Sequence, residues 1–128
     1  MASSSTTATV FNQISNRRFV LSIDDNSLLS VADNNNTVLN AVRIDNTANT
    51  HAVYLKLYNS DSGAAGTLGT TNPEWIFPCA ASSTADFSLD AGYTFTVGIQ
   101  AACVQNAGTA GTTSVSNAVT CVILATIP

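Results

Sequence analysis

The segment HAVYLKLY at residues 51–58 decides the fold class, together with the loop NSDSGAAGTLGTTNP at 59–73 and the segment EWIFP at 74–78. In the first segment Val53, Leu55 and Leu57 occupy alternate positions, which is typical of a strand with one buried face. The loop is made mainly of Gly, Ser, Thr, Asn and Asp, residues that favour turns and do not support a packed helix. We therefore expect a core strand, a long exposed loop and an aromatic anchor at Trp75 to lie together.

The same alternation continues on both sides of this segment, and no stretch has the 3.6-residue period of a helix. The sequence predicts further strands at residues 9–14, 17–23, 37–44, 83–89, 93–104 and 115–127. We expect residues 37–44 to form a hairpin with 51–58, and residues 90–92 to form a turn. The last predicted strand is apolar on both faces near its end, as in a strand that is buried on both sides or covered by another subunit. These patterns predict an all-β protein.

A length of 128 residues fits one domain with a sizeable core. We place this domain at residues 9–128. The preceding residues 1–8, which are mainly Ser, Thr and Ala, are expected to be either a flexible tail or an arm that contacts a neighbouring subunit.

The composition excludes several classes of partner. Only 9% of the residues are charged and the net charge is −4. Nucleic-acid binding requires clustered positive charge, whereas the four basic residues are few and scattered: Arg17, Arg18, Arg43 and Lys56. No apolar run is long enough to cross a bilayer, and the N-terminus lacks the pattern of a secretory signal, so we expect synthesis in a cytosol and no membrane partner. The low proportion of charged residues favours a protein whose surface is partly covered by neighbouring subunits in an assembly.

Residues suited to catalysis are almost lacking. His51 is the single histidine and is expected at the surface, next to a turn. Cys79, Cys103 and Cys121 have spacings that match no zinc motif, and we expect no disulfide framework. Cys103 and Cys121 share the alternation of apolar neighbours, so we expect them to be buried free thiols. A bridge between Cys103 and Cys121 on paired strands is the alternative that applies in an oxidising medium. We predict no catalytic residue, no metal and no cofactor.

A resemblance becomes visible along residues 51–127. The chain reads AVYLKLYN, then a Gly/Thr loop ending in GTTNPEWIFP, then a strand, and then DAGYTFTVGIQAACV. A Thr-rich loop and an apolar last strand follow. This order resembles that of small structural proteins from tailed phages, including cyanophages. The segment CAASST departs from the glycine-rich turn that the family more often has there.

The resemblance implies an antiparallel β-sandwich, jelly-roll or Ig-like, of about seven to nine strands with an extended N-terminal arm. It further implies a decoration or cement protein that is made in the host cytoplasm and lies on the capsid surface of a virion. Such a protein binds the major capsid protein and itself, as a dimer or trimer. The predicted interface residues are Phe11, Trp75, Ile76, Phe77, Ile123, Leu124 and Ile127. The alternatives are a tail or baseplate structural protein, and a carbohydrate-binding or host-adhesion module in which Trp75, Tyr54, Tyr58 and Tyr93 form a stacking platform.

Overall fold

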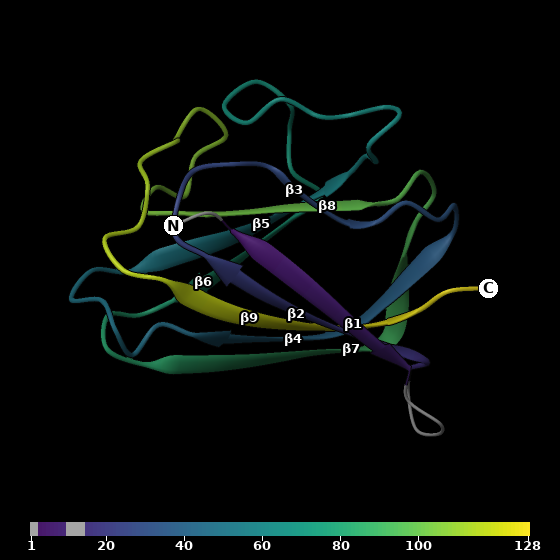
Figure 1. Ribbon diagram of the computed structural model, residues 1–128, viewed down its shortest axis with the longest axis horizontal. Helices are drawn as coiled ribbons and strands as arrows, with labels where there is room; N and C mark the ends of the chain where they lie inside the picture. Colours follow the sequence, from purple (N-terminus) through teal and green to yellow (C-terminus); the bar gives the residue numbers. More distant parts are fainter. Residues whose placement is uncertain (1–2, 10–14) are drawn as a thin grey trace.

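The computed structural model describes residues 3–9 and 15–128. In this part of the chain nine strands form two sheets, every neighbouring pair of strands is antiparallel, and no helix is present. The two sheets pack face to face (Figure 1). The expected all-β sandwich is confirmed.

The first sheet, called sheet A, has five strands in the spatial order β1-β2-β9-β4-β7. Their bounds are β1 Ser4–Thr9, β2 Arg17–Ile23, β9 Val119–Thr126, β4 Thr37–Asp45 and β7 Thr84–Phe95. The second sheet, called sheet B, has four strands in the order β3-β8-β5-β6. Their bounds are β3 Leu29–Ala32, β8 Ile99–Val104, β5 Val53–Asn59 and β6 Trp75–Cys79.

Alternate side chains of each sheet fill the core. On β5 the core-facing set is Val53, Leu55 and Leu57, each fully buried, as the alternation predicts. Sheet A contributes the inner residues of its central strands, which are Phe19, Leu21 and Ile23 on β2, Leu39, Val42 and Ile44 on β4, and Val119, Cys121, Ile123 and Ala125 on β9. Burial of this apolar surface is the main driving force for folding.

Two predicted connections are wrong. The segments 37–44 and 51–58 do not form a hairpin, because β4 pairs with β7 and β9 in sheet A whereas β5 pairs with β6 and β8 in sheet B. The turn between them crosses from one sheet to the other. It is held by the buried Asn46, whose Nδ2 donates to the carbonyls of His51 and Ala80 at 2.9 and 3.0 Å.

The predicted turn at residues 90–92 is instead a bulge within β7. Leu39 of β4 pairs with Tyr93 and Ala41 pairs with Ser88, so four residues of β7 lie opposite Asn40 alone. Gly92 has φ of 70° in this bulge, and a Cβ there would lie 2.5 Å from Val38 Cγ1. The bulge also changes the alternation of β4, so Leu39 points inward with Val42 while Val38 is half-buried on the other face.

The expected strand at 93–104 is divided in the structure. Its first residues complete β7, which ends at Phe95, and its last residues form β8, which begins at Ile99. The division takes the chain from sheet A to sheet B.

The N-terminal segment is extended and pairs with its own chain. Residues 4–9 form β1, which follows β2 through six consecutive residue pairs. Contact of residues 1–8 with a neighbouring subunit stays a prediction. The strand expected at 9–14 lies outside the described residues except for Thr9.

Two loops cover part of the outer face of sheet B, where they lie above β8 and β5 in Figure 1. Lys56 of β5 is fully buried beneath the loop that follows β8, and its Nζ donates to the carbonyls of Gly108 and Gly111 at 2.6 and 3.0 Å. Gln100 of β8 accepts hydrogen bonds through Oε1 from the Ser60 hydroxyl and the Gly66 amide of the loop after β5. Polar side chains of sheet B therefore hold both loops in place.

We predict that two neighbouring residues of β9 differ sharply in their contribution to stability. Ile123 is fully buried in the core, whereas Leu124 is half-buried on the outer face. Ile123→Ala should lower the free energy of unfolding by about 2–5 kcal/mol through lost burial and a cavity. Leu124→Ala should cost on the order of 1 kcal/mol. Urea denaturation of both variants checks this, and equal losses would contradict the assigned faces.

We also predict a pH dependence that originates at Lys56, where burial lowers the pKa of the ammonium group below its ordinary 10.5. Between the lowered pKa and 10.5 the unfolded chain holds a proton that the folded chain has released, so wild-type stability rises with pH in this window. The Lys56→Met variant lacks this contribution. The free energy of unfolding of the wild type minus that of the variant should therefore increase with pH, as measured by urea denaturation. A difference that is independent of pH would contradict the prediction.

Candidate docking face

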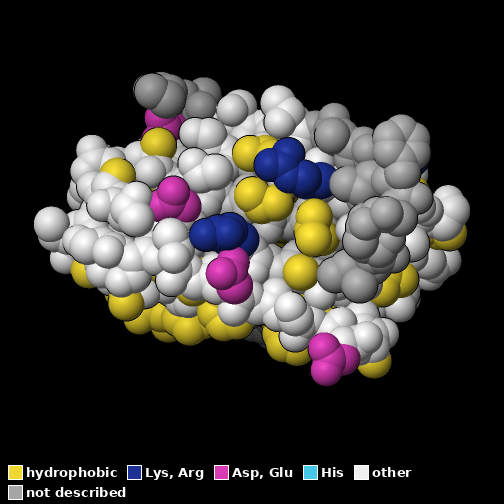
Figure 2. All heavy atoms as spheres, turned by 90° about the horizontal axis from the view of Figure 1, so that it is seen from below, with side chains coloured by type: hydrophobic (Ala, Val, Ile, Leu, Met, Phe, Trp, Pro, Cys, Tyr) yellow, Lys and Arg dark blue, Asp and Glu magenta, His cyan; other side chains and the backbone are white. Residues whose placement is uncertain are grey.

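The outer face of sheet A carries an apolar centre. Val20 of β2 lies opposite Val122 of β9, and Leu124 of β9 lies opposite Ala41 of β4. All four residues are half-buried. Figure 2 shows this side of the molecule, where hydrophobic side chains lie between basic ones. We call these four residues, together with Arg18, Arg43 and Asp86 around them, the docking face.

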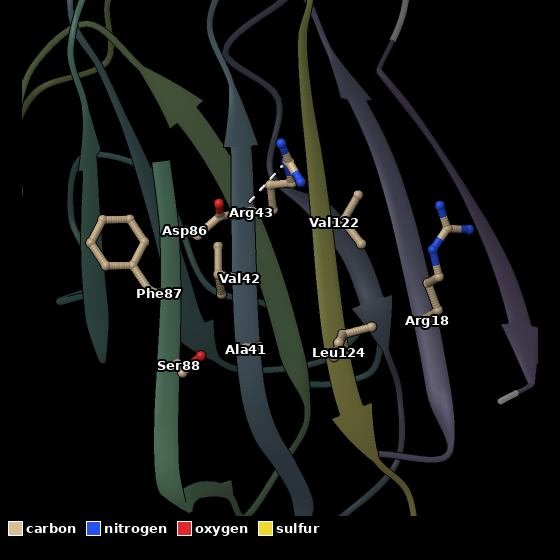
Figure 3. A pocket seen from close by; sticks show the side chains of 9 residues that line it. All are labelled: Arg18, Ala41, Val42, Arg43, Asp86, Phe87, Ser88, Val122 and Leu124. Carbon is tan, nitrogen blue, oxygen red and sulfur yellow. Dashed lines mark ion pairs between the residues drawn. The ribbon is translucent and has the colours of Figure 1, made fainter. Parts of the chain in front are cut away.

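The strands of sheet A position the charged residues of this face. Arg18 is opposite Leu124 in the pairing of β2 with β9, and Arg43 is opposite Val122 in the pairing of β9 with β4. Arg43 in turn is opposite Asp86 of β7, and its Nε lies 3.6 Å from Asp86 Oδ1. A shallow hollow of about 580 Å³ lies between these side chains (Figure 3).

The Arg43–Asp86 ion pair leaves both residues available to a partner. Their side chains are 60% and 67% exposed. Exposed ion pairs contribute little to stability because water and salt screen them. The pair therefore holds the two side chains next to each other at the edge of the hollow, and the stability of the fold depends little on either one.

The accessible basic residues of the chain all lie on this sheet, whose strands β4 and β7 also carry Asp45, Asp86 and Asp90. Of the four Lys and Arg residues in the chain, Lys56 is buried under a loop of sheet B. The other three are Arg17 and Arg18 on β2 and Arg43 on β4, and all have solvent-accessible surface. Sheet A thus presents every solvent-accessible Lys or Arg side chain of a chain whose net charge is −4.

The predicted interface residues fall into separate parts of the structure. Leu124 lies on the docking face and Ile76 is exposed on the outer face of sheet B, with 38% of its surface accessible. Ile127 is half-buried just beyond β9. Phe77 and Ile123 point into the core, so their side chains cannot contact a partner in this fold, and the prediction is corrected at these two positions. Phe11 lies outside the described residues.

Trp75 belongs to an aromatic cluster between the edge strands β6 and β7. Its ring is stacked on Phe77 with centroids 5.6 Å apart and meets Tyr93 edge-on at 5.5 Å. Phe77 continues the cluster to Phe87 at 5.0 Å, and Tyr93 continues it to Phe95 at 5.2 Å. The cluster joins the two sheets at this edge, which is the anchoring role expected of large aromatics.

The four aromatics considered for a stacking platform do not form one surface. Tyr58 points away from the core on the outer side of sheet B, yet its side chain is fully buried. Its hydroxyl has no hydrogen-bond partner among the described residues. Tyr93 lies on β7 of sheet A, where its hydroxyl donates to Glu74 Oε2 at 2.8 Å. This hydrogen bond is the main reason that the pKa of Tyr93 is raised above its ordinary value.

The three cysteines are free and buried, which confirms the expected burial of Cys103 and Cys121 and adds Cys79. Cys103 and Cys121 are not on paired strands, because β8 belongs to sheet B and β9 to sheet A. The pKa of Cys121 is raised well above its ordinary value. The largest cause is a hydrogen bond with the Cys103 thiol, and the second largest is burial. This keeps Cys121 as an unreactive thiol.

His51 lies at a turn, where its Nε2 is 3.1 Å from the Ser116 hydroxyl and accepts from the Ser116 amide at 3.2 Å. Within residues 3–9 and 15–128, no three His, Cys, Asp or Glu side chains gather in a way that could hold a metal ion. The described residues also form no helix long and apolar enough to cross a membrane.

Sequence reasoning identified Leu124 but missed the rest of the docking face. The run VTCVILATI, apolar on both faces, was the available signal, and it contains Val122 as well. Arg18 and Arg43 carried no such signal, because only the pairing of β2, β9 and β4 brings them to the same face.

Comparison of the chain with protein-family models, curated proteins and solved structures found no match. The fold and the docking face therefore rest on the structure itself, and the resemblance to structural proteins of tailed phages stays a prediction.

Proposed function

We propose that this chain is a structural protein of a tailed-phage virion, where many copies decorate and cement the capsid shell. The observation that supports a docking role is the apolar centre of sheet A, formed by Val20, Ala41, Val122 and Leu124 on its outer face. A solvated face of an antiparallel sheet ordinarily carries polar residues. Covering the apolar strip on the central strand β9 with a protein partner is energetically more favourable than leaving it in contact with water.

Charge defines the chemistry of this partner. Arg18 and Arg43 flank the apolar strip, and both are exposed. A complementary surface would present an apolar patch with carboxylates at its edges. We therefore propose that the major capsid protein supplies such a patch on the shell and that sheet A faces it.

The virion setting has a separate basis. It depends on the resemblance of residues 51–127 to tailed-phage structural proteins. A shell component gains strength by summing small contacts over many copies, so a broad shallow face suits it better than a deep pocket. Such a face is also the ordinary form of a protein–protein interface.

The first test is the number of copies of this chain in purified particles, measured by quantitative mass spectrometry against the major capsid protein. A ratio near one, or a simple fraction of one, is expected for a shell component. A few to a few dozen copies per particle would overturn the capsid placement in favour of the tail, and no copies would end the virion proposal.

The second test addresses the face. We predict that the double variant Val122→Thr/Leu124→Thr binds shells at least about tenfold more weakly, because apolar contacts at an interface centre carry most of the binding free energy. The matched control is Ile76→Thr, which makes the same kind of change on the outer face of sheet B. Binding is measured by co-sedimentation with shells that lack the protein. Loss of binding with Ile76→Thr, but not with the double variant, would contradict the assignment of sheet A.

A further inference from the structure

The four edge strands of the sandwich differ in how they are protected against pairing with another chain. Proteins commonly block such edges with proline, charge, bulges or short strands. On β6, Pro78 removes one backbone donor. On β7, the bulge at residues 89–92 interrupts the edge, and Asp86 and Asp90 add charge. The edge strand β3 has only four residues, with an irregularity between Ser30 and Ala32.

Strand β1 has none of these features. Its sequence, SSTTAT, contains no charged residue and no proline, and its six residues pair with β2 without a bulge. In the described part of the chain no strand pairs with the outer edge of β1. The backbone N–H and C=O groups along that edge are thus available to another strand.

We propose that β1 pairs with β1 of a second copy, antiparallel and about a two-fold axis at Thr6. The two copies of sheet A then form one continuous sheet, and their outer faces lie on the same side. Because paired residues must point to the same face, the two-fold axis passes through a residue position. With the axis at Thr6, Ser3 pairs with Thr9 of the other copy, and the paired segments contain only described residues.

The charges at the two ends of β1 favour this direction. At one end, Thr9 pairs with Arg17 of β2 and Ala8 pairs with Arg18. At the other end, the Ser3 hydroxyl donates to Asp25 Oδ1 at 3.0 Å. Antiparallel pairing sets the basic end of each copy beside the acidic end of the other, whereas parallel pairing would set like charges together.

The residue at the axis suits a strand pair. Thr6 is exposed and lies opposite Val20, which places it on the outer face of sheet A. In the dimer Thr6 is opposite Thr6 of the second copy, and threonine pairs across strands are favourable. This dimer does not depend on the virion setting, because it follows from the edges of the fold alone.

The test is the mass of the purified full-length chain by sedimentation equilibrium. The wild type should be a dimer, and Thr6→Lys should weaken self-association at least tenfold, because it sets two like charges directly opposite each other. The matched control is Thr84→Lys, the same substitution at an exposed position of the other edge of sheet A, which should leave the dimer intact. A wild type that is monomeric at all concentrations, or a dimer that survives Thr6→Lys, overturns the proposal.

Cysteine cross-linking tests the register and the direction. Residues directly opposite in an antiparallel pair have Cα atoms about 4.5–5.5 Å apart, within the range of a disulfide. Thr6→Cys should therefore cross-link two copies in oxidised glutathione, which accepts the two electrons released by the thiols. Ser4→Cys should not cross-link, because two such residues are about 13 Å apart along the strands. Cross-linking of Ser4→Cys, as in-register parallel pairing would give, overturns the proposal. The three natural cysteines are buried.

Discussion

The structure depends on the pairing of the last strand between two strands from the first half of the chain. Strand β9 lies between β2 and β4, in register with β2 along seven consecutive residue pairs. Its inner side chains Val119, Cys121, Ile123 and Ala125 are all fully buried. Sheet A cannot form completely until the C-terminal strand pairs with β2 and β4. Contacts between residues so distant in sequence make folding slower than in proteins whose contacts are mainly local. The same strand also places Val122 and Leu124 at the centre of the outer face.

The few charges of the chain are distributed unevenly between the two sheets. Sheet B uses its single lysine internally, because the Lys56 ammonium group holds the loop after β8 through two carbonyls. Sheet A leaves its arginines accessible and holds none of them in the core. Loops cover part of one outer face, and apolar residues among basic ones occupy the other. The two outer faces of the sandwich therefore differ in chemistry, and we propose that partner binding occurs on sheet A.

Much of the fold could be predicted from local patterns, because alternation at Val53, Leu55 and Leu57 depends on no other part of the chain. The bulge in β7 could not be predicted from the sequence, because Asp90, Ala91 and Gly92 form a typical turn sequence. Only the pairing with β4 shows that the strand continues through them. The burial of Phe77 rather than Ile76 follows the alternation of β6, which the sequence EWIFP is too short to reveal. The docking face depends on the register of three strands that are distant in sequence, so Leu124 was predicted and Arg18 was not.

The most direct test is hydroxyl-radical footprinting of the chain, free and mixed with the capsid shells that we propose it binds, with each modified residue located by mass spectrometry. If a partner covers sheet A, as we propose, Val122, Leu124 and Arg18 lose reactivity on binding. Ile76 and Tyr54, on the outer face of sheet B, should react equally in both states. Protection of Ile76 and Tyr54, with Leu124 still reactive, would contradict the account and assign the contact to the opposite sheet.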